Sequence, residues 1–319
     1  MLRTRILWAV ALLGCAVATQ ARAQGAGKKV VFVNSYHQGY EWSDGEEAGL
    51  KSVLGPAGVD LRVFYMDTKR NPDPKAQKEA GRKAKELIDA LQPDAVIVAD
   101  DNAAEEVLVQ YYKNAKIPFV FCGVNWDASR YGLPYTNTTG MLEVGLVKEL
   151  VDNLREYAKG GRVGLLAADT ESQRVDGKFF GQLLNGLARE VYVKTFPEWK
   201  DQFQRMQGEV DILIVGNPAG ITGWDNAAAA DWALANGKVP SGTIHEFVMP
   251  YAMLGMTKIG QEQGIWTAKA VLEILKGKPA GSIPIVKNKE AKLKINVKLA
   301  SKAGVVFKPA LARNAEVVK

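Results

Sequence analysis

The sequence predicts an α/β protein with two Rossmann-like lobes, each a parallel sheet flanked by helices. Short apolar runs alternate with amphipathic helical stretches along most of the chain, which is typical of a parallel sheet with helices on both faces. The alternation falls into two sets of about four strand–helix units, separated near Asn137-Thr138-Thr139-Gly140. A chain of 319 residues with 47% hydrophobic content is more consistent with two domains than with one.

In the first half, the apolar runs at residues 30–33, 61–66, 95–99 and 118–122 are candidate strands. A helix is expected to begin at Ser43, because Glu46 follows three residues later in a capping-box pattern. A second helix is expected over residues 74–91, where apolar side chains recur on one face.

The second half repeats this organisation. Candidate strands lie at residues 163–167, 191–193, 212–215 and 243–244, and candidate helices at 144–157, around 179–187 and at 261–276. Gly277-Lys278-Pro279 ends the last of these helices. The lysine-rich tail after Ile285 has no strong periodicity, so we expect surface strands and turns there.

The N-terminus has the composition of a bacterial signal peptide. A positively charged start, an apolar run over residues 6–18 and the small-x-small site at 21–23 follow one another. The apolar run is shorter than the roughly 20 residues of a membrane-spanning helix. We therefore expect residues 1–23 to be removed and the mature chain to be periplasmic. In the alternative, the Leu-Leu-Gly-Cys sequence ending at Cys15 is a lipobox, and the protein is a lipoprotein anchored through Cys15.

Composition argues against several classes of function. Residues 1–23 carry three arginines and no acidic residue, so the formal charge of +6 falls to +3 without them, and we expect no nucleic-acid partner. Cys122 is then the only cysteine, and the chain has two histidines, which makes a metal site or a His-based triad hard to assemble. No G-x-S-x-G, Walker or G-x-G-x-x-G motif is present. We expect no enzyme activity, no cofactor and no metal.

Polar and aromatic side chains follow the candidate strands, and ligands of open parallel sheets bind beyond the carboxyl ends of the strands. Aromatic faces with a few polar groups suit a small organic molecule. Asp101 and Asn102 also suit a helix cap, and Tyr40 and Trp42 also suit packing of their loop against the sheet. The candidate ligand-binding residues are Ser35, Tyr36, His37, Tyr40, Trp42, Asp101, Asn102, Asn125, Trp126, Thr170, Asn217 and Glu246.

The segment at residues 34–44, Asn-Ser-Tyr-His-Gln-Gly-Tyr-Glu-Trp-Ser-Asp, resembles one in the ABC-transporter substrate-binding family that contains tryptophan- and phenylalanine-binding members, and in related sensor domains of bacterial kinases. The segments at 137–140, 274–279 and 283–285 also resemble the family's, and the likeness covers about residues 28–309. Tryptophan-type members tend to have a small-residue turn where this chain has Asp100-Asp101-Asn102, so the identity of the ligand is not carried over.

The resemblance implies a type I periplasmic-binding fold with a three-crossing hinge. Lobe one would comprise residues 24–141 and 251–281, and lobe two residues 142–250 and 282–319. The protein would be a monomer that traps a small organic molecule, amino-acid-like or aromatic, between its lobes and delivers it to the membrane permease of an ABC importer. The alternatives are a periplasmic sensor that feeds a signalling partner and, more distantly, an enzyme on a similar scaffold.

Overall fold

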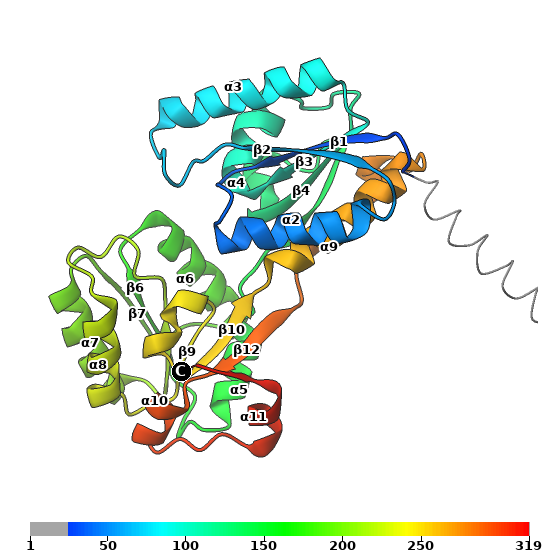
Figure 1. Ribbon diagram of the computed structural model, residues 1–319. Coiled ribbons are helices and arrows are strands. Elements are labelled where there is room, and N and C mark those ends of the chain that lie inside the picture. Colours follow the sequence, from blue (N-terminus) through cyan, green and yellow to red (C-terminus); the bar gives the residue numbers. More distant parts are fainter. Residues whose placement is uncertain (1–24, 319) are drawn as a thin grey trace, which may run out of the picture. The chain divides into compact units, whose positions relative to one another are not determined.

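The computed structural model describes residues 25–318, so the candidate signal peptide and Cys15 lie outside the described residues. The chain forms two compact units (Figure 1). The first comprises the residues up to Val144 together with Ile259–Asn288, and the second comprises Gly145–Lys258 together with the residues from Lys289 onward. The chain therefore passes from one unit to the other three times. Residues 251–258 belong to the second unit and 282–288 to the first, whereas the sequence placed each in the other lobe.

The first unit is built on a parallel six-stranded sheet with the strand order β11-β5-β4-β3-β1-β2. The four strands predicted in the first half are confirmed as β1 to β4. The strands are β1 (Lys29–Asn34), β2 (Asp60–Tyr65), β3 (Ala95–Ala99), β4 (Phe119–Asn125), β5 (Thr138–Glu143) and β11 (Val286–Lys287). The segment at 137–140 therefore enters the buried strand β5, and the first crossing lies past the end of that strand.

Helices cover both faces of this sheet. Figure 1 shows α3 on one face, and α2 and α9 together on the other. The predicted helix at 74–91 is confirmed as α3, and Asp73 caps it by accepting from the backbone N–H groups of Lys75 and Ala76. The helical segments are α2 (Glu41–Leu54), α3 (Pro74–Leu91), α4 (Asp100–Ala103), the π-helix η1 (Ala104–Val109), the 3₁₀ turns η2 (Ala128–Tyr131) and η4 (Ala280–Ser282), and α9 (Gly260–Leu275).

The predicted capping box at the start of α2 is wrong. The helix begins at Glu41, and Tyr40 occupies the N-cap position without a side-chain cap. Ser43 instead donates its hydroxyl to Asn34 Oδ1 at 2.8 Å, and Glu46 is fully buried. Both side chains thus serve contacts with strand β1 and not the end of their own helix.

The second unit contains a seven-stranded sheet with the order β13-β12-β10-β9-β8-β6-β7, in which only the β10–β12 pairing is antiparallel. Its strands are β6 (Val163–Ala168), β7 (Arg189–Val193), β8 (Ile212–Val215), β9 (Ser241–Thr243), β10 (Leu254–Lys258), β12 (Ala291–Ile295) and β13 (Glu316–Val317). Its helical segments are α5 (Val147–Arg155), α6 (Glu171–Leu184), α7 (Phe196–Glu209), α8 (Asn226–Asn236), η3 (Glu246–Tyr251), α10 (Val297–Lys302) and α11 (Pro309–Asn314). The tail therefore contains short helices as well as the expected strands.

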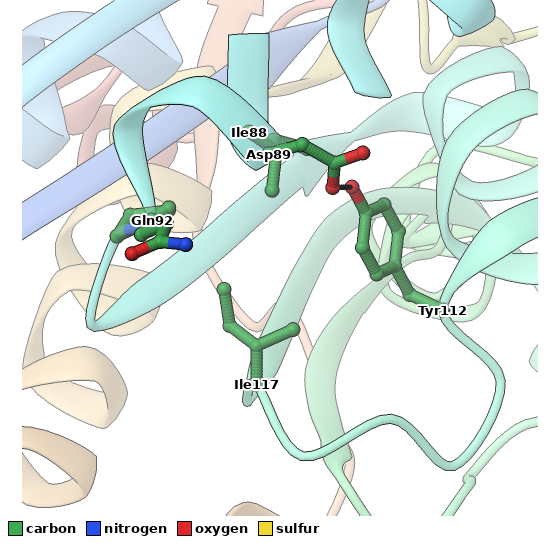
Figure 2. Close-up of a pocket in the computed structure, with 6 residues that line it drawn as sticks. Ile88, Asp89, Gln92, Tyr112 and Ile117 are labelled. Atoms are coloured by element: carbon green, nitrogen blue, oxygen red, sulfur yellow. Dashed lines mark hydrogen bonds between the residues drawn. The ribbon is translucent and has the colours of Figure 1, made fainter. Parts of the chain in front are cut away.

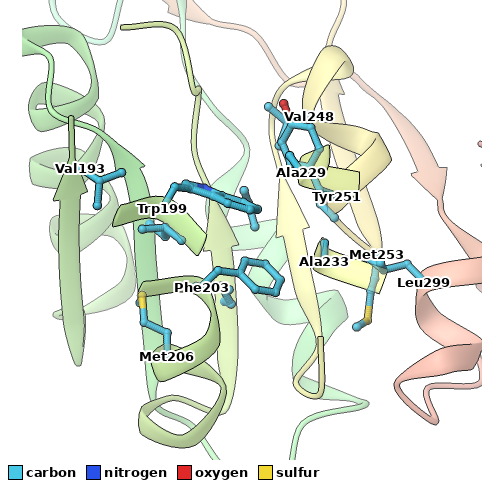
Figure 3. Close-up of a cluster of buried hydrophobic side chains, with 14 of the residues drawn as sticks. Val193, Trp199, Phe203, Met206, Ala229, Ala233, Val248, Tyr251, Met253 and Leu299 are labelled. Atoms are coloured by element: carbon cyan, nitrogen blue, oxygen red, sulfur yellow. The ribbon is translucent and has the colours of Figure 1, made fainter. Parts of the chain in front are cut away.

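The core of the second unit depends on α7, a helix that the sequence analysis missed. Thr195 and Glu198 form a true capping box at its start. Trp199 stacks on Phe203 with ring centroids 5.0 Å apart and meets Trp224 edge to face at the same distance. Figure 3 shows Trp199 and Phe203 within this cluster of buried side chains, which also contains Tyr251. Such aromatic pairs stabilise a core beyond the area that they bury.

In the first unit, α2 and α9 approach so closely that their backbones meet. A Cβ at Gly49 of α2 would collide with the carbonyl oxygen of Gln261, and a Cβ at Gly264 of α9 would collide with that of Glu46. Gly45 and Gly260 lie one turn earlier on the same helix faces, and a Cβ at either would also meet backbone atoms. This contact fixes the position of the residues on α2.

The substitution Gly264→Ala tests this contact. Because the added methyl group would meet a backbone oxygen that cannot rotate away, we expect a loss of about 1–3 kcal/mol of stability, seen as a lower melting temperature. Gly181→Ala is the matched control, since Gly181 is also helical and nothing lies within 4 Å of its Cβ position. The control should be neutral or slightly stabilising. Equal melting temperatures for both variants would contradict the close contact.

Candidate functional site

The candidate site of the first unit lies at the edge of the sheet where β1, β3 and β4 end, here called the carboxyl edge. These strands are parallel and lie in the order β4-β3-β1, so the residues that follow them come together. Ser35 links two of them: its hydroxyl donates to the carbonyl oxygen of Ala99 at 2.6 Å and accepts from the backbone N–H of Ala103 at 2.8 Å. Ser35 is buried, so its hydroxyl holds the edge together.

Asp101 lies at the centre of a polar cluster at this edge. Asn125 donates to its Oδ2 at 2.7 Å, Tyr131 donates to its Oδ1 at 2.9 Å, and the Arg130 guanidinium lies 3.2 Å away. The Asp101 side chain keeps 22% of its surface exposed. Burial and the charge of Asp101 raise the pKa of Tyr131, which keeps its hydroxyl a hydrogen-bond donor. Tyr131 and Arg130 were not predicted from the sequence: they lie in the 3₁₀ turn η2, several residues farther along the chain than the candidates Asn125 and Trp126.

Asn102 links the carboxyl edge to the loop after β2 and to helix α3. Its side-chain oxygen lies 3.3 Å from the donating hydroxyl of Thr68, and its amide donates to Gln77 of α3 at 3.2 Å. The alternative of a helix cap is wrong for both Asp101 and Asn102, because α4 begins at Asp100 and has no side-chain cap.

Three aromatic side chains lie close together at the part of the carboxyl edge that follows β1. The rings of Tyr36 and Tyr40 meet at 81° with centroids 5.3 Å apart, and the ring of His37 lies 5.8 Å from Tyr40. The ammonium of Lys69 lies over both tyrosine rings. Burial raises the pKa of Tyr36, and the charges of Asp100 and Asp101 raise it further.

The two candidate tryptophans differ in exposure. Trp42 is partly exposed and donates its indole N–H to Asp100 Oδ1 at 2.9 Å. Trp126 is only 6% exposed and has a φ of 57°. Its backbone N–H donates to the backbone carbonyl oxygen of Glu143. Most of the Trp126 ring is therefore covered in this structure.

A buried polar layer lies beneath the edge, and sequence analysis did not identify it. It centres on Glu46 and Asp100, whose exposed fractions are 0% and 1%. At Gly123, with a φ of 68°, a Cβ would lie 2.7 Å from Asp100 Oδ1 and 2.9 Å from Glu46 Oε1. Gln263 of α9 accepts from the Gly123 N–H at 3.1 Å and donates to the Leu142 carbonyl at 3.2 Å. Both carboxyl groups therefore lie against the backbone of β4, where only glycine leaves room for them.

Burial and proximity determine the protonation of this layer. Burial raises the pKa of Glu46, and the charge of Asp100 raises it further, against a smaller opposite effect of the neighbouring Cys122, Trp42 and Asn34 side chains. Burial, together with Glu46 and Asp100, also raises the pKa of the Cys122 thiol. Glu46 shares a helix face with Leu50 and Leu54, and this spacing could have indicated its burial.

The candidate residues of the second unit lie after β6, β8 and β9. Thr170 caps α6 by accepting from Gln173, and Gln173 accepts from the backbone N–H of Asn217 at 2.8 Å, so Thr170 and Asn217 are brought near each other. Glu246 is engaged elsewhere. It pairs with Lys294 of β12 and accepts from Thr257 of β10.

A hollow at the opposite end of the first unit has no comparable chemistry. It is lined by Ile88, Asp89, Gln92, Pro93, Tyr112 and Ile117, which lie before the amino ends of β3 and β4 (Figure 2). Asp89 is the one carboxylate among these lining residues, and it already accepts a hydrogen bond from the Tyr112 hydroxyl at 2.8 Å. Within residues 25–318, no cluster of three or more His, Cys, Asp or Glu is arranged to hold a metal ion, and none of the helices is long and apolar enough to cross a membrane.

A family model described as ABC transporter substrate binding protein matches residues 44–319. The chain therefore belongs to the ABC transporter substrate-binding protein family, as the sequence resemblance indicated. Proteins of this family are typically periplasmic or extracellular. No curated protein matches the sequence.

Solved structures share the fold at low sequence identity. A ligand-free, open substrate-binding protein with adhesive properties from Clostridium difficile is 18% identical, with a TM-score of 0.73 over 92% of this chain and 99% of that one. An ABC domain from Streptococcus pneumoniae in complex with L-Trp is 16% identical, with a TM-score of 0.60 over 92% and 100%. A solute-binding protein from Rhodopseudomonas palustris in complex with p-hydroxybenzoic acid is 14% identical, with a TM-score of 0.55 over 81% and 82%. The predicted type I periplasmic-binding fold is confirmed.

The raised pKa of Glu46 predicts a pH dependence of stability. Above the ordinary pKa of 4.5, the folded chain holds a proton on Glu46 that the unfolded chain has lost. The free energy of unfolding therefore falls as the pH rises from about 4.5 through the higher pKa of the folded state. Glu46→Gln should make this fall shallower in denaturant titrations across that range, whereas Glu86→Gln on the exposed face of α3 should leave it as in the parent. An unchanged slope for Glu46→Gln would contradict the assignment.

Proposed function

We propose that the protein is the periplasmic solute-binding component of an ABC importer and that it binds a small organic molecule, amino-acid-like or aromatic. The observation that carries the proposal is the carboxyl edge of the first unit. There Tyr36, Tyr40 and Trp42 are partly exposed, and Asn125 donates a hydrogen bond to Asp101 at the same edge. Aromatic faces with a few fixed polar groups, at the edge where parallel sheets bind ligands, suit such a molecule.

The solved relatives support a small aromatic or amino-acid ligand. The pneumococcal domain is bound to L-Trp and the Rhodopseudomonas protein to p-hydroxybenzoic acid. Family membership supports a membrane permease as the partner that receives the ligand. In this proposal, residues 1–23 direct export.

We infer binding and release without catalysis. A nucleophile needs an accessible, activated oxygen or sulfur. At the carboxyl edge, Ser35 is buried and its hydroxyl donates to a backbone carbonyl, so it is neither accessible nor activated. The Cys122 thiol is buried and its pKa is raised, so it is not a thiolate at neutral pH.

Calorimetry on variants tests the site. A thermal-shift screen of amino acids and aromatic acids first identifies the ligand, since a ligand at about 100 times its Kd adds about 2.7 kcal/mol of stability. Asp101→Ala should then weaken binding about tenfold or more, because a hydrogen bond to a charged group contributes about 1.5–3 kcal/mol.

Lys83→Ala is the control for this measurement. Lys83 lies on the exposed face of α3, 4.0 Å from Glu79, and its removal should leave the affinity unchanged. If Asp101→Ala and Trp42→Ala both remain folded and bind as the parent does, the ligand lies elsewhere.

A further inference from the structure

We propose that Tyr36 and Tyr40 form the subsite for an ammonium group of the ligand, and that the side chain of Lys69 competes with the ligand for it. This proposal rests on the proposed function and narrows its ligand to organic amines. The two rings, almost perpendicular at 81°, form the walls of a corner. The Lys69 ammonium lies in this corner, 4.1 Å from the centroid of Tyr36 and 4.7 Å from that of Tyr40.

Both distances fall within the roughly 6 Å over which the face of an aromatic ring attracts a cation. A single ammonium in this corner therefore contacts two rings at once. Geometry of this kind recognises organic ammonium groups in general, because ring faces attract the charge without requiring a specific hydrogen-bond direction.

Nearby carboxylates make the corner more favourable for a cation. The charges of Asp100 and Asp101 act on the Tyr36 hydroxyl. Asp101 also interacts with Arg130, and Asp100 accepts from the indole of Trp42. A cation in the aromatic corner is therefore attracted by these nearby carboxylates as well as by the ring faces.

The backbone explains why Lys69 reaches this corner. The N–H groups of Asp67 and Thr68 donate to the carbonyl oxygens of Tyr36 and Ser35, each at 2.9 Å. These bonds fix the loop after β2 beside the loop after β1. Lys69 itself is exposed and its side chain has several rotatable bonds, so holding its ammonium in one place costs conformational entropy. A ligand with an ammonium on a rigid frame avoids that cost and can displace it.

The opposite role for Lys69 makes a distinct prediction. If its ammonium stays in place and pairs with a carboxylate of the ligand, removal of Lys69 weakens binding of carboxylates. If it competes for the corner, its removal strengthens binding of amines. Two probes with the same phenylethyl group separate these roles: 2-phenylethylamine, a cation, and 3-phenylpropionate, an anion.

The test combines NMR with affinity measurements on the full mature chain. We expect millimolar 2-phenylethylamine to shift the ε-methylene signals of Lys69 away from their ring-current position, and 3-phenylpropionate to leave them in place. Lys69→Gln should tighten binding of the amine about two- to thirtyfold, the range that corresponds to one cation–ring contact. Lys113→Gln is the matched control, because the Lys113 ammonium lies 5.3 Å from the ring centroid of Tyr135, before β5 and away from the carboxyl edge.

Three results would overturn the proposal: Lys69 signals that do not respond to the amine, a Lys69→Gln variant that binds the amine no better than the parent, and a loss of 3-phenylpropionate binding in that variant. In each case the proposed function stands if the thermal-shift screen finds another ligand. A screen in which no small organic molecule stabilises the chain contradicts the proposed function itself.

Discussion

Helices α2 and α9 meet backbone to backbone at Gly49 and Gly264, where a Cβ would collide with a carbonyl oxygen of the facing helix. The two helices are therefore packed with no side chains between them at these positions. Trp42 and Glu46, on α2, are thereby held against β1, β3 and β4, and the carboxyl edge takes its shape from their positions. Gln263 of α9 completes the arrangement by bonding to the backbone of β4 and β5.

The same constraint places two carboxyl groups where solvent cannot reach them. Burying a carboxylate is costly unless it is paired or keeps its proton, and Glu46 beside Asp100 retains its proton to higher pH. In return, Asp100 accepts from the indole of Trp42, and the Ser43 hydroxyl bonds to Asn34. Hydrogen bonds from this buried layer therefore hold side chains at the carboxyl edge in place, and a ligand meets groups that are already oriented.

The sequence predicts the elements well where the signal is local. Two predicted strands, 95–99 and 212–215, match the structure because each is a continuous apolar run. The predicted helix 74–91 matches because it has an Asp-Pro start and one apolar face. The capping-box interpretation failed because Ser43 bonds to Asn34 of β1, a partner outside its own helix. The sequence placed Asp101 and Asn125 at the edge, and they are bonded there. It could not distinguish the buried Asp100 from Asp101, because that difference arises from the left-handed backbone at Asp100. Lys69 reaches its rings through a loop from another strand, which no spacing in the sequence reveals.

The most direct test of the account is the position of a bound ligand. The strongest hit of the thermal-shift screen would be co-crystallised with the mature protein. The account predicts electron density for the ligand in contact with Tyr36, Tyr40 or Trp42 and within hydrogen-bond distance of the Asp101 cluster. Density confined to another place, such as the hollow beside Tyr112, with the carboxyl edge filled only by solvent, would contradict it.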